Sequence, residues 1–343
     1  MTPRLADIAQ QAGVSEATVS RVLNGRSGVS PATRESVLAA LDTLGYERPT
    51  RLRHRSAGLV GLITPELDNP IFPAFAQVIE RALILQGFTP VLCTLTPGGV
   101  PEDDFIDLML EREVAGIVFV SGLHADTTAN PARYLRLVER GLPIVLVNGY
   151  NEAVPAPSLS TDDRVAARLA VSHLVDLGHE RIGLAVGPRR FFPVLRKVEG
   201  YARAMRELLG AEDVGGLVEH TIFSVEGGAA AGAALLARGC TAIICGSDMM
   251  ALGAISAARE LGRLVPREVS VVGYDDSPLI AFTDPPLTTV RQPVSAMGVA
   301  AVRALLDEIA GLPVPRSEFV YRPELVVRGS TGAAPRPVAS RTA

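Results

Sequence analysis

Apolar residues recur at helical spacing in three short segments at the start of the chain. In the first, positions 5, 8, 9 and 12 are apolar and Gly13 follows, as expected where a helix ends. Ser15 precedes the second segment as a candidate N-cap, and Ser30 followed by Pro31 begins the third in the order typical of a helix start. A helix, a tight turn at Gly13 and a second helix form a helix-turn-helix. The expected helices cover 5–12, 16–23 and 31–44, and the inward-facing residues of the second and third are Val19, Val22, Leu23, Val37, Leu38, Leu41 and Leu44.

Beyond residue 58, short apolar runs alternate with longer amphipathic patterns. The runs are rich in β-branched residues, which indicates parallel strands buried on both faces by helices. The expected strands are Leu59–Ile63, Thr89–Leu92, Gly116–Val120, Ile144–Val147, Ile182–Val186, Ala242–Cys245 and Val269–Val272. The expected helices cover about 73–86, 130–140, 163–177, 196–209, 225–238, 248–261 and 294–310.

This alternation predicts a doubly wound α/β body. Because roughly 270 residues are many for one such sheet, we expect two lobes, the first made of 58–160 with 291–330 and the second of 161–290. Ligands of such folds bind at the carboxyl ends of the strands.

Two segments are too polar or too small in their side chains for a core. Residues 46–57 are expected to form a basic hinge or linker that follows a helix-turn-helix domain over 1–45. Residues 331–343 are mostly small and include two prolines, so we expect a disordered tail there.

Charge is divided unevenly along the chain. The 343 residues include 33 Lys+Arg and 37 Asp+Glu, for a net charge of −4. Residues 1–57 hold eight Arg and five acidic residues, a balance of +3, so the remainder carries −7. A small basic head on an acidic body is expected where only one end of a protein binds a polyanion.

Composition argues against several classes of protein. The 3 Cys are an odd number, and none has a His at zinc-finger spacing. No segment reaches the roughly 18 apolar residues of a membrane span, and no signal peptide is evident, so we expect a cytoplasmic protein without membrane association. Lys197 is the only lysine and Val198 follows it, which excludes a Walker A loop. Dinucleotide, nucleophile-elbow and zinc-protease motifs are also missing, so neither an enzyme nor a cofactor or metal site is expected.

The sequence closely resembles the LacI/GalR family of transcriptional regulators from about residue 4 to 330. The resemblance rests on these stretches: Leu5-Ala6-Asp7-Ile8-Ala9, Ala12-Gly13-Val14-Ser15, Thr18-Val19-Ser20-Arg21-Val22-Leu23-Asn24-Gly25, Leu177-Gly178-His179, Ser247-Asp248-Met249-Met250 and Val272-Gly273-Tyr274-Asp275-Asp276. It implies a homodimeric repressor of palindromic operator DNA, with a two-lobed periplasmic-binding-protein-like body and a small-molecule effector between the lobes. Residues 121–128 and 191–199 look most like maltose-regulon (MalR-type) repressors, which implies maltose, a maltodextrin or a related α-glucoside as effector.

The resemblance makes the second helix the recognition helix. Glu16, Ala17 and Arg21 match positions that read bases: Arg21 can bind guanine O6 and N7 with both guanidinium arms, and Glu16 can accept from cytosine N4. Glu16 also suits the alternative of a first-turn acid that offsets the helix dipole. The residues that match phosphate-contact positions are Ser15, Thr18, Ser20, Asn24, Ser30 and Thr33.

The linker departs from the family pattern. Most members place a leucine there that wedges into the minor groove, but this chain has Ser56 at that position, which leaves Leu52 as the apolar candidate. Arg51 and Arg53 suit contacts to phosphates or to a narrow minor groove. A flexible tether is the alternative.

A sugar site needs aromatic faces together with polar groups that bind vicinal hydroxyls. The candidates follow strand ends or match family positions near the ligand: Asn69, Phe72, Asn148, Asp163, Phe192, Phe223, Asp248 and Asp275. The alternative role of Asp163 is to cap a helix, and that of Phe72 is to pack in the core. Tyr274 is expected to pack between the lobes.

Lys197 is the candidate that distinguishes this chain. The family usually has arginine three residues before the Gly200-Tyr201 pair, whereas this chain, which uses arginine everywhere else, has lysine. Lysine is a compact charge with three rotatable donors, and arginine a planar fork. We expect Lys197 to contact sugar hydroxyls, with an unremarkable surface lysine as the alternative.

Two other functions stay open on the sequence. One is a solute-binding module for sugar uptake, which would share the two-lobed fold. The other is a repressor that responds to an effector other than a sugar.

Overall fold

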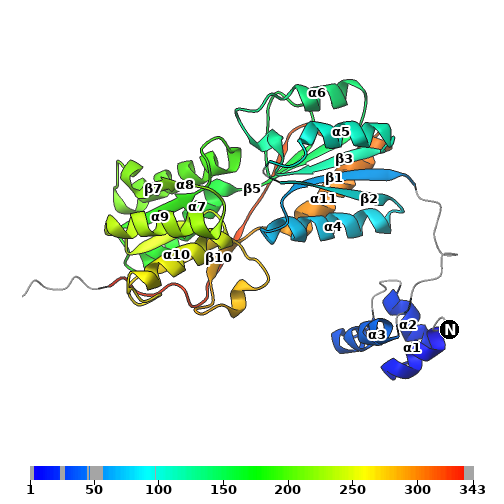
Figure 1. The fold of residues 1–343 in the computed structure, drawn as a ribbon, viewed down its shortest axis with the longest axis horizontal. Helices are drawn as coiled ribbons and strands as arrows, with labels where there is room; N and C mark the ends of the chain where they lie inside the picture. The colour runs from blue at the N-terminus through cyan, green and yellow to red at the C-terminus, as the bar shows by residue number, and fades with distance from the viewer. Residues whose placement is uncertain (1–3, 24–27, 45, 47–56, 97, 336–343) are drawn as a thin grey trace, which may run out of the picture. The chain divides into compact units, whose positions relative to one another are not determined.

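The computed structural model describes residues 4–23, 28–44, 46, 57–96 and 98–335, and the chain divides into two compact units, Met1–Arg55 and Ser56–Ala343 (Figure 1). The smaller unit contains α1 (Leu5–Ala12), α2 (Glu16–Leu23) and α3 (Pro31–Thr43). The sequence prediction of three helices is confirmed. All three contribute to one core, made of Ile8, Ala9, Val19, Val22, Val37 and Ala40.

The sequence signals at the ends of these helices act as expected. Gly13 has φ +66° and ends α1 in the left-handed conformation that favours glycine. Ser30 accepts a hydrogen bond from the Thr33 N–H at 3.1 Å and caps α3. The prediction that Leu38 is buried is wrong: its side chain is 53 % exposed, because Val37 and Ala40 occupy the inward face of α3.

The first lobe of the larger unit is a six-stranded parallel sheet in the order β11-β5-β4-β3-β1-β2. Helices α4 (Ile71–Leu85) and α11 (Val294–Ile309) pack on one face, and α5 (Glu102–Glu111) and α6 (Ala132–Glu139) pack on the other. The strands are β1 (Leu59–Pro65), β2 (Thr89–Leu95), β3 (Gly116–Val120), β4 (Ile144–Val147), β5 (Ser158–Thr161) and β11 (Glu318–Tyr321).

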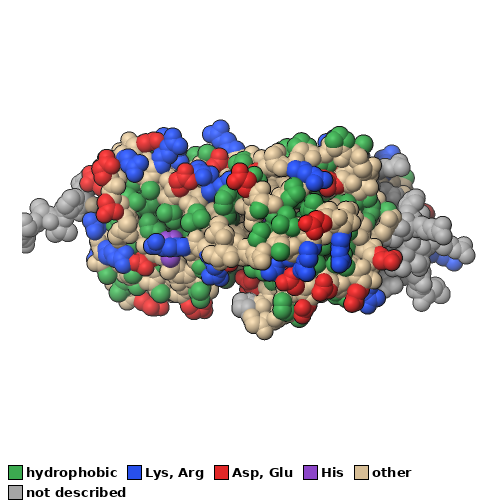
Figure 2. All heavy atoms as spheres, turned by 90° about the horizontal axis from the view of Figure 1, so that it is seen from above, with side chains coloured by type: hydrophobic (Ala, Val, Ile, Leu, Met, Phe, Trp, Pro, Cys, Tyr) green, Lys and Arg blue, Asp and Glu red, His purple; other side chains and the backbone are tan. Residues whose placement is uncertain are grey.

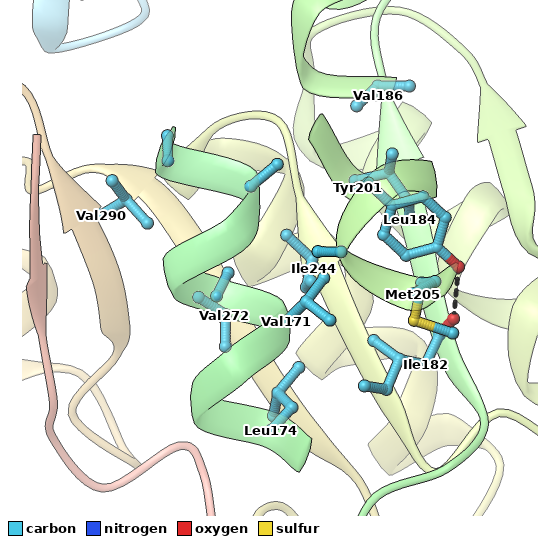
Figure 3. Close-up of a cluster of buried hydrophobic side chains, with 14 of the residues drawn as sticks. Val171, Leu174, Ile182, Leu184, Val186, Tyr201, Met205, Ile244, Val272 and Val290 are labelled. Carbon is cyan, nitrogen blue, oxygen red and sulfur yellow. Dashed lines mark hydrogen bonds between the residues drawn. The ribbon is translucent and has the colours of Figure 1, made fainter. Parts of the chain in front are cut away.

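The second lobe repeats this plan in the order β12-β10-β9-β8-β6-β7, with β12 antiparallel to β10. Helices α7 (Asp163–Asp176) and α8 (Phe192–Leu209) cover one face, where the Tyr201 hydroxyl donates to the Ile182 carbonyl at 2.7 Å (Figure 3). Helices α9 (Val225–Ala237) and α10 (Asp248–Glu260) cover the other. The strands are β6 (Ile182–Val186), β7 (Val218–His220), β8 (Ala242–Cys245), β9 (Ser270–Asp275), β10 (Thr288–Arg291) and β12 (Glu324–Val326).

The chain passes between the lobes three times: after β5, after β10 and between β11 and β12. The sequence boundaries differ from this at one place, because residues 324–330 return to the second lobe, where β12 pairs with β10. Helix α5 and strands β5, β7, β10, β11 and β12 were not among the expected elements. Most of these strands have only three or four residues, too few for a clear period of two.

The expectation of disorder from residue 331 is wrong for residues 331–335. The Thr331 hydroxyl lies 2.9 Å from Nε2 of His173, and the Gly332 N–H donates to the Ser270 hydroxyl at 3.0 Å. The Ala334 N–H donates to the Leu177 carbonyl at 2.8 Å. These hydrogen bonds hold the segment against the second lobe, although its composition is typical of a tail. Residues 336–343 lie outside the described part.

None of the described helices is long and apolar enough to cross a membrane.

Helices α9 and α10 approach each other closely through glycines. A Cβ at Gly253 would overlap the carbonyl oxygen of Val225, and a Cβ at Gly228 would overlap that of Met250. Because both obstacles are backbone atoms, neither can be relieved by turning a side chain. The contact therefore requires glycine at both positions.

We expect Gly253→Ala to lower the melting temperature by several degrees, since overpacking of a tight contact costs about 1–3 kcal/mol. Thermal unfolding of the full chain measures this. Gly216→Ala is the matched control, because a Cβ there meets no atom within 4 Å. Equal melting temperatures for the two variants would contradict the close helix contact.

Asp248 joins the start of α10 to the neighbouring strands. Its carboxylate accepts from the Ser277 N–H at 2.7 Å and from the Thr289 hydroxyl at 2.6 Å. Burial outweighs these bonds and raises the pKa of Asp248 to about 6. A raised pKa in the folded state means that protonation stabilises the fold, and this contribution is lost as the pH rises through about 6.

We expect Asp248→Asn to stabilise the protein relative to wild type more at about pH 7.5 than at about pH 5, by roughly 2–6 °C in melting temperature. An asparagine can accept from the Ser277 N–H and donate to the Thr289 hydroxyl, so both hydrogen bonds survive without the charge. The control is Asp107→Asn on the exposed side of α5. A pH-independent difference between Asp248→Asn and wild type would contradict the raised pKa.

Candidate functional site

Helix α2 presents a polar face. Glu16, Ala17 and Arg21 are exposed, whereas Val19 and Val22 are buried in the core of the small unit. The three predicted base-reading residues therefore lie together on the accessible side of the helix, with a spacing that suits a major groove.

The predicted phosphate-contact hydroxyls also cap helices. The Ser15 hydroxyl accepts from the Thr18 N–H at 3.2 Å and lies 3.0 Å from the Thr18 hydroxyl. The Ser30 hydroxyl makes the same pair of contacts with Thr33. Ser20 is half-buried on α2. Four predicted DNA-contact residues lie outside the described part: Asn24, Arg51, Leu52 and Arg53.

A cavity of about 390 Å³ lies between the two lobes of the larger unit. Its walls come from residues at or just beyond the carboxyl ends of β1, β3 and β4 in the first lobe and of β8 and β9 in the second, together with the start of α8. This volume is in the range of small-molecule sites. Of the nine predicted effector residues, seven line it: Asn69, Phe72, Asn148, Asp163, Lys197, Phe223 and Asp275.

Lys197 is buried, with 7 % of its surface exposed, so the alternative of a surface lysine is wrong. Its Nζ donates to Oδ1 of Asp163 at 2.5 Å and lies 3.8 Å from the centre of the Tyr274 ring. The Tyr274 hydroxyl donates to the same Oδ1 at 2.7 Å. Burial and the charge of Asp163 raise the pKa of Tyr274, which keeps this hydroxyl a donor. Helix capping falls to Asp162, whose carboxylate accepts from the Val165 N–H at 3.0 Å.

Gln292 connects the polar groups of both lobes. Its Nε2 donates to Asp275 at 2.7 Å, and its Oε1 accepts from Asn148 at 3.2 Å and from Thr161 at 2.9 Å. The Asn69 side chain also binds Asp275. Burial, followed by the charge of Asp248, raises the pKa of Asp275 well above its usual value. Burial thus favours the neutral form of this carboxyl group over its charged form.

Aromatic rings form the apolar part of the cavity wall. Phe223 packs against Gly187, where a Cβ would overlap its ring, and lies 6.3 Å from the Phe191 ring, tilted by 50°. Phe72 lines the cavity and also packs against the first-lobe core, so both interpretations of this residue hold.

Two predicted effector residues do not line the cavity. The first turn of α8 directs Phe192 toward the first lobe. The centre of its ring lies 4.2 Å from Cζ of Arg196 and 6.1 Å from the centre of the Tyr150 ring. The Asp248 carboxylate accepts hydrogen bonds from Ser277 and Thr289. Its neighbour Ser247 lines the cavity, and Asp248 itself does not.

Sequence reasoning missed several lining residues, among them Glu66, Ser121, Ser247 and Gln292. Ser121 and Ser247 follow β3 and β8, so the strand-end argument could have found them. Gln292 follows β10, which was not among the expected strands. Tyr274, expected between the lobes, lines the cavity there. Within the described residues, no three His, Cys, Asp or Glu side chains are placed to hold a metal ion.

Comparison with protein families agrees with this architecture. The model for bacterial regulatory proteins of the lacI family matches residues 4–49, which contain α1 to α3. The model for a periplasmic binding protein-like domain matches residues 171–331.

Curated relatives and solved structures cover nearly the whole chain. The HTH-type transcriptional regulators reg1 of Streptomyces lividans and MalR of Streptomyces coelicolor are each 67 % identical to it, over 98 % of both chains. A complex of the transcriptional regulator CelR with cellobiose has a TM-score of 0.72 at 32 % identity, covering 96 % of this chain and 99 % of that one. A lac repressor dimer bound to operator and an anti-inducer has a TM-score of 0.70 at 28 % identity, with coverage of 97 % and 100 %. The chain belongs to the LacI family of DNA-binding transcriptional regulators.

Proposed function

We propose that this protein is a cytoplasmic repressor that binds a palindromic operator as a homodimer, and that a small sugar in the inter-lobe cavity controls its affinity for DNA. Maltose, a maltodextrin or a related α-glucoside is the proposed effector. The observation that carries the proposal is the cavity itself, which combines buried hydrogen-bonding groups with aromatic rings. The 67 % identity to a regulator named MalR supports the choice of sugar.

The charges in the cavity favour an uncharged ligand. Asp163 compensates the charge of Lys197, and burial favours the neutral form of Asp275. An anionic ligand would compete with Asp163 for Lys197, and a cation would have to displace Lys197 itself. A neutral polyol need not compete with Asp163 or displace Lys197. Its hydroxyls can both donate and accept hydrogen bonds beside the rings of Phe191 and Phe223.

The exposed face of α2 supports the DNA-binding half of the proposal. Arg21 has the length and fork geometry to grip guanine, and Ala17 beside it leaves room for a thymine methyl. On the face of the larger unit that Figure 2 draws, acidic and basic side chains are interspersed. A phosphate backbone favours a surface of positive charge alone, which this face does not offer.

Exposed apolar side chains support association of two copies. Leu85 on α4 is 72 % exposed, and Leu279 and Phe282 after β9 are 76 % and 86 % exposed. Leu279 and Phe282 lie three residues apart, and apolar side chains that together form a patch favour burial against a partner surface. A second copy of the chain also matches the two-fold symmetry of a palindromic operator.

We expect Arg21→Ala to weaken operator binding about 10- to 100-fold, the worth of one bidentate contact to guanine. The probe is palindromic DNA selected by the wild-type full chain from a randomised library, titrated at fixed salt. Arg112→Ala removes the same charge from an exposed site on the body and should leave the affinity unchanged. Equal affinities for the two variants would contradict base reading by α2, and failure of the wild type to select any DNA would favour the uptake module.

We expect Phe223→Leu to weaken maltose binding about three- to tenfold, because the ring loses its stacking surface. Lys197→Met should abolish binding, because it removes the ammonium group that donates hydrogen bonds to the hydroxyls of the sugar. Calorimetry with maltose, maltotriose and cellobiose measures both. Phe319→Leu, on β11 and outside the cavity, is the control.

The two variants also separate sugar binding from folding. Lys197→Met leaves Asp163 buried without its partner and can destabilise the fold, whereas Phe223→Leu keeps every hydrogen bond of the cavity. Operator binding in the absence of sugar should be unchanged in Phe223→Leu. Wild-type binding to none of the sugars would favour an effector of another class, and normal sugar affinity in Phe223→Leu would remove this ring from the site.

A further inference from the structure

Two loops from opposite lobes are joined at the edge of the cavity. Arg190 Nε donates to Oδ2 of Asp126 at 2.8 Å, and the N–H and hydroxyl of Thr127 both donate to the Arg190 carbonyl at 2.8 Å. Asp126 and Phe191 also form an isolated antiparallel bridge. We call these contacts between Asp126–Thr127 and Arg190–Phe191 the clasp.

The ion-paired side chains of the clasp, Asp126 and Arg190, lie directly beside the cavity and are not among its lining residues. Ala125 and Phe191 line the cavity, whereas their neighbours Asp126 and Arg190 do not. A bound ligand therefore lies against the residues next to the clasp, and movement of either loop changes the wall that the ligand meets.

The first-lobe side of the clasp is held rigidly by buried polar groups. Glu102, 2 % exposed, accepts from the Leu123 N–H at 3.0 Å and from the Tyr134 hydroxyl at 2.5 Å. His124 Nε2 donates to the Val147 carbonyl at 3.1 Å, and burial lowers the pKa of His124 to about 4, so its ring is neutral near pH 7. The 3₁₀ turn Leu123–Ala125 is thereby fixed to the first lobe.

The side chain of Asp126 is itself oriented by its own turn. Its Oδ1 accepts from the Thr128 N–H at 2.9 Å and from the Thr128 hydroxyl at 2.6 Å, which leaves Oδ2 for Arg190. On the second lobe, the Arg190 guanidinium lies 4.7 Å from the centre of the Phe191 ring. Each partner is thus also held by a contact within its own loop.

A second ion pair between the lobes is built differently. Arg196 of α8 binds Glu318 of β11 through two hydrogen bonds of 2.6 Å, and each side chain is 11 % exposed. This pair lies next to a chain crossing, because β11 leads directly into β12. In the clasp, by contrast, the Arg190 side chain is 50 % exposed, while that of Asp126 is 9 % exposed. Water and salt screen such a pair, so the clasp is the weaker of the two links.

We propose that the clasp is the releasable link between the lobes, and that Asp126 and Arg190 raise the affinity for the effector by stabilising the closed cavity without touching the ligand. They are positioning residues, and this role rests on the proposed function of the cavity as the effector site. Lobes that turn about the chain crossings must separate the clasp to open, so its free energy adds directly to that of the closed state.

The test uses the full-length protein with Asp126→Asn, Arg190→Met and the double variant. Asparagine keeps the hydrogen bonds to Thr128, and methionine keeps most of the arginine stem. Each single variant should weaken maltose binding about two- to fivefold in calorimetry, and the double variant should be no weaker than the singles, because one interaction is lost in all three. Raising the ionic strength from about 50 mM to about 500 mM should weaken wild-type binding and leave Arg190→Met unchanged. The control is Arg189→Met, which removes an exposed charge from the adjacent residue.

A second measurement needs no ligand. Amide hydrogen exchange in peptides that span 122–131 should be faster in Arg190→Met than in Arg189→Met, because the Thr127 N–H loses the support of the ion pair. Equal exchange in the two variants would overturn the clasp, as would additive effects in the double variant. If wild type binds none of the sugars tested, the proposed effector is wrong, and the exchange measurement still decides whether the clasp holds the lobes.

Discussion

The buried ion pair between Lys197 and Asp163 is the constraint on which the rest of the cavity depends. Two charges removed from water are tolerated only if they meet each other and further hydrogen bonds complete the site, and here Tyr274 supplies both a donor to Asp163 and a ring beneath Lys197. Asp163 begins α7 and Lys197 lies on α8, so the pair requires these helices to pack closely. Gly200 permits this, because a Cβ there would meet the backbone of Arg164.

The same requirement explains the other polar groups between the lobes. Among the described residues Asp275 has no salt bridge, although the charge of Lys197 acts on it; Asn69 and Gln292 bind it, while burial shifts it toward the neutral acid. Besides Glu66 in its wall, the cavity contains one lysine that is paired with a carboxylate and one carboxyl with a raised pKa, and it offers many hydrogen bonds. This combination matches a sugar. Hydroxyls of a bound sugar supply hydrogen bonds to the buried polar groups in place of water, which offsets the free-energy cost of desolvating them.

The parts of this structure that sequence predicted are those with a strong local signal. The strands β1, β3, β4, β6 and β8 are apolar runs, as is the first part of β9. The ends of the runs in β1, β4 and β9 led directly to Asn69, Asn148 and Asp275. The short strand β10 carries little period, so Gln292 after it was missed. Phe192 was misplaced because the turn of α8 that directs Phe191 and Lys197 into the cavity sends the next ring outward. Packing between lobes decides such a choice, and a single sequence does not encode it locally.

The distribution of links between the lobes fits a molecule that must both hold and release a ligand. The buried Arg196–Glu318 pair joins α8 to β11, the strand that leads into one of the three chain crossings, and it is a strong, desolvated interaction. Among the links that opening has to break, those between Asp126, Thr127 and Arg190 are an ion pair whose arginine is half exposed and two hydrogen bonds to one carbonyl. A weak interaction here can favour the closed state of the lobes and still allow the open state to be populated. A buried ion pair at the same place would hold the lobes almost entirely in the closed state.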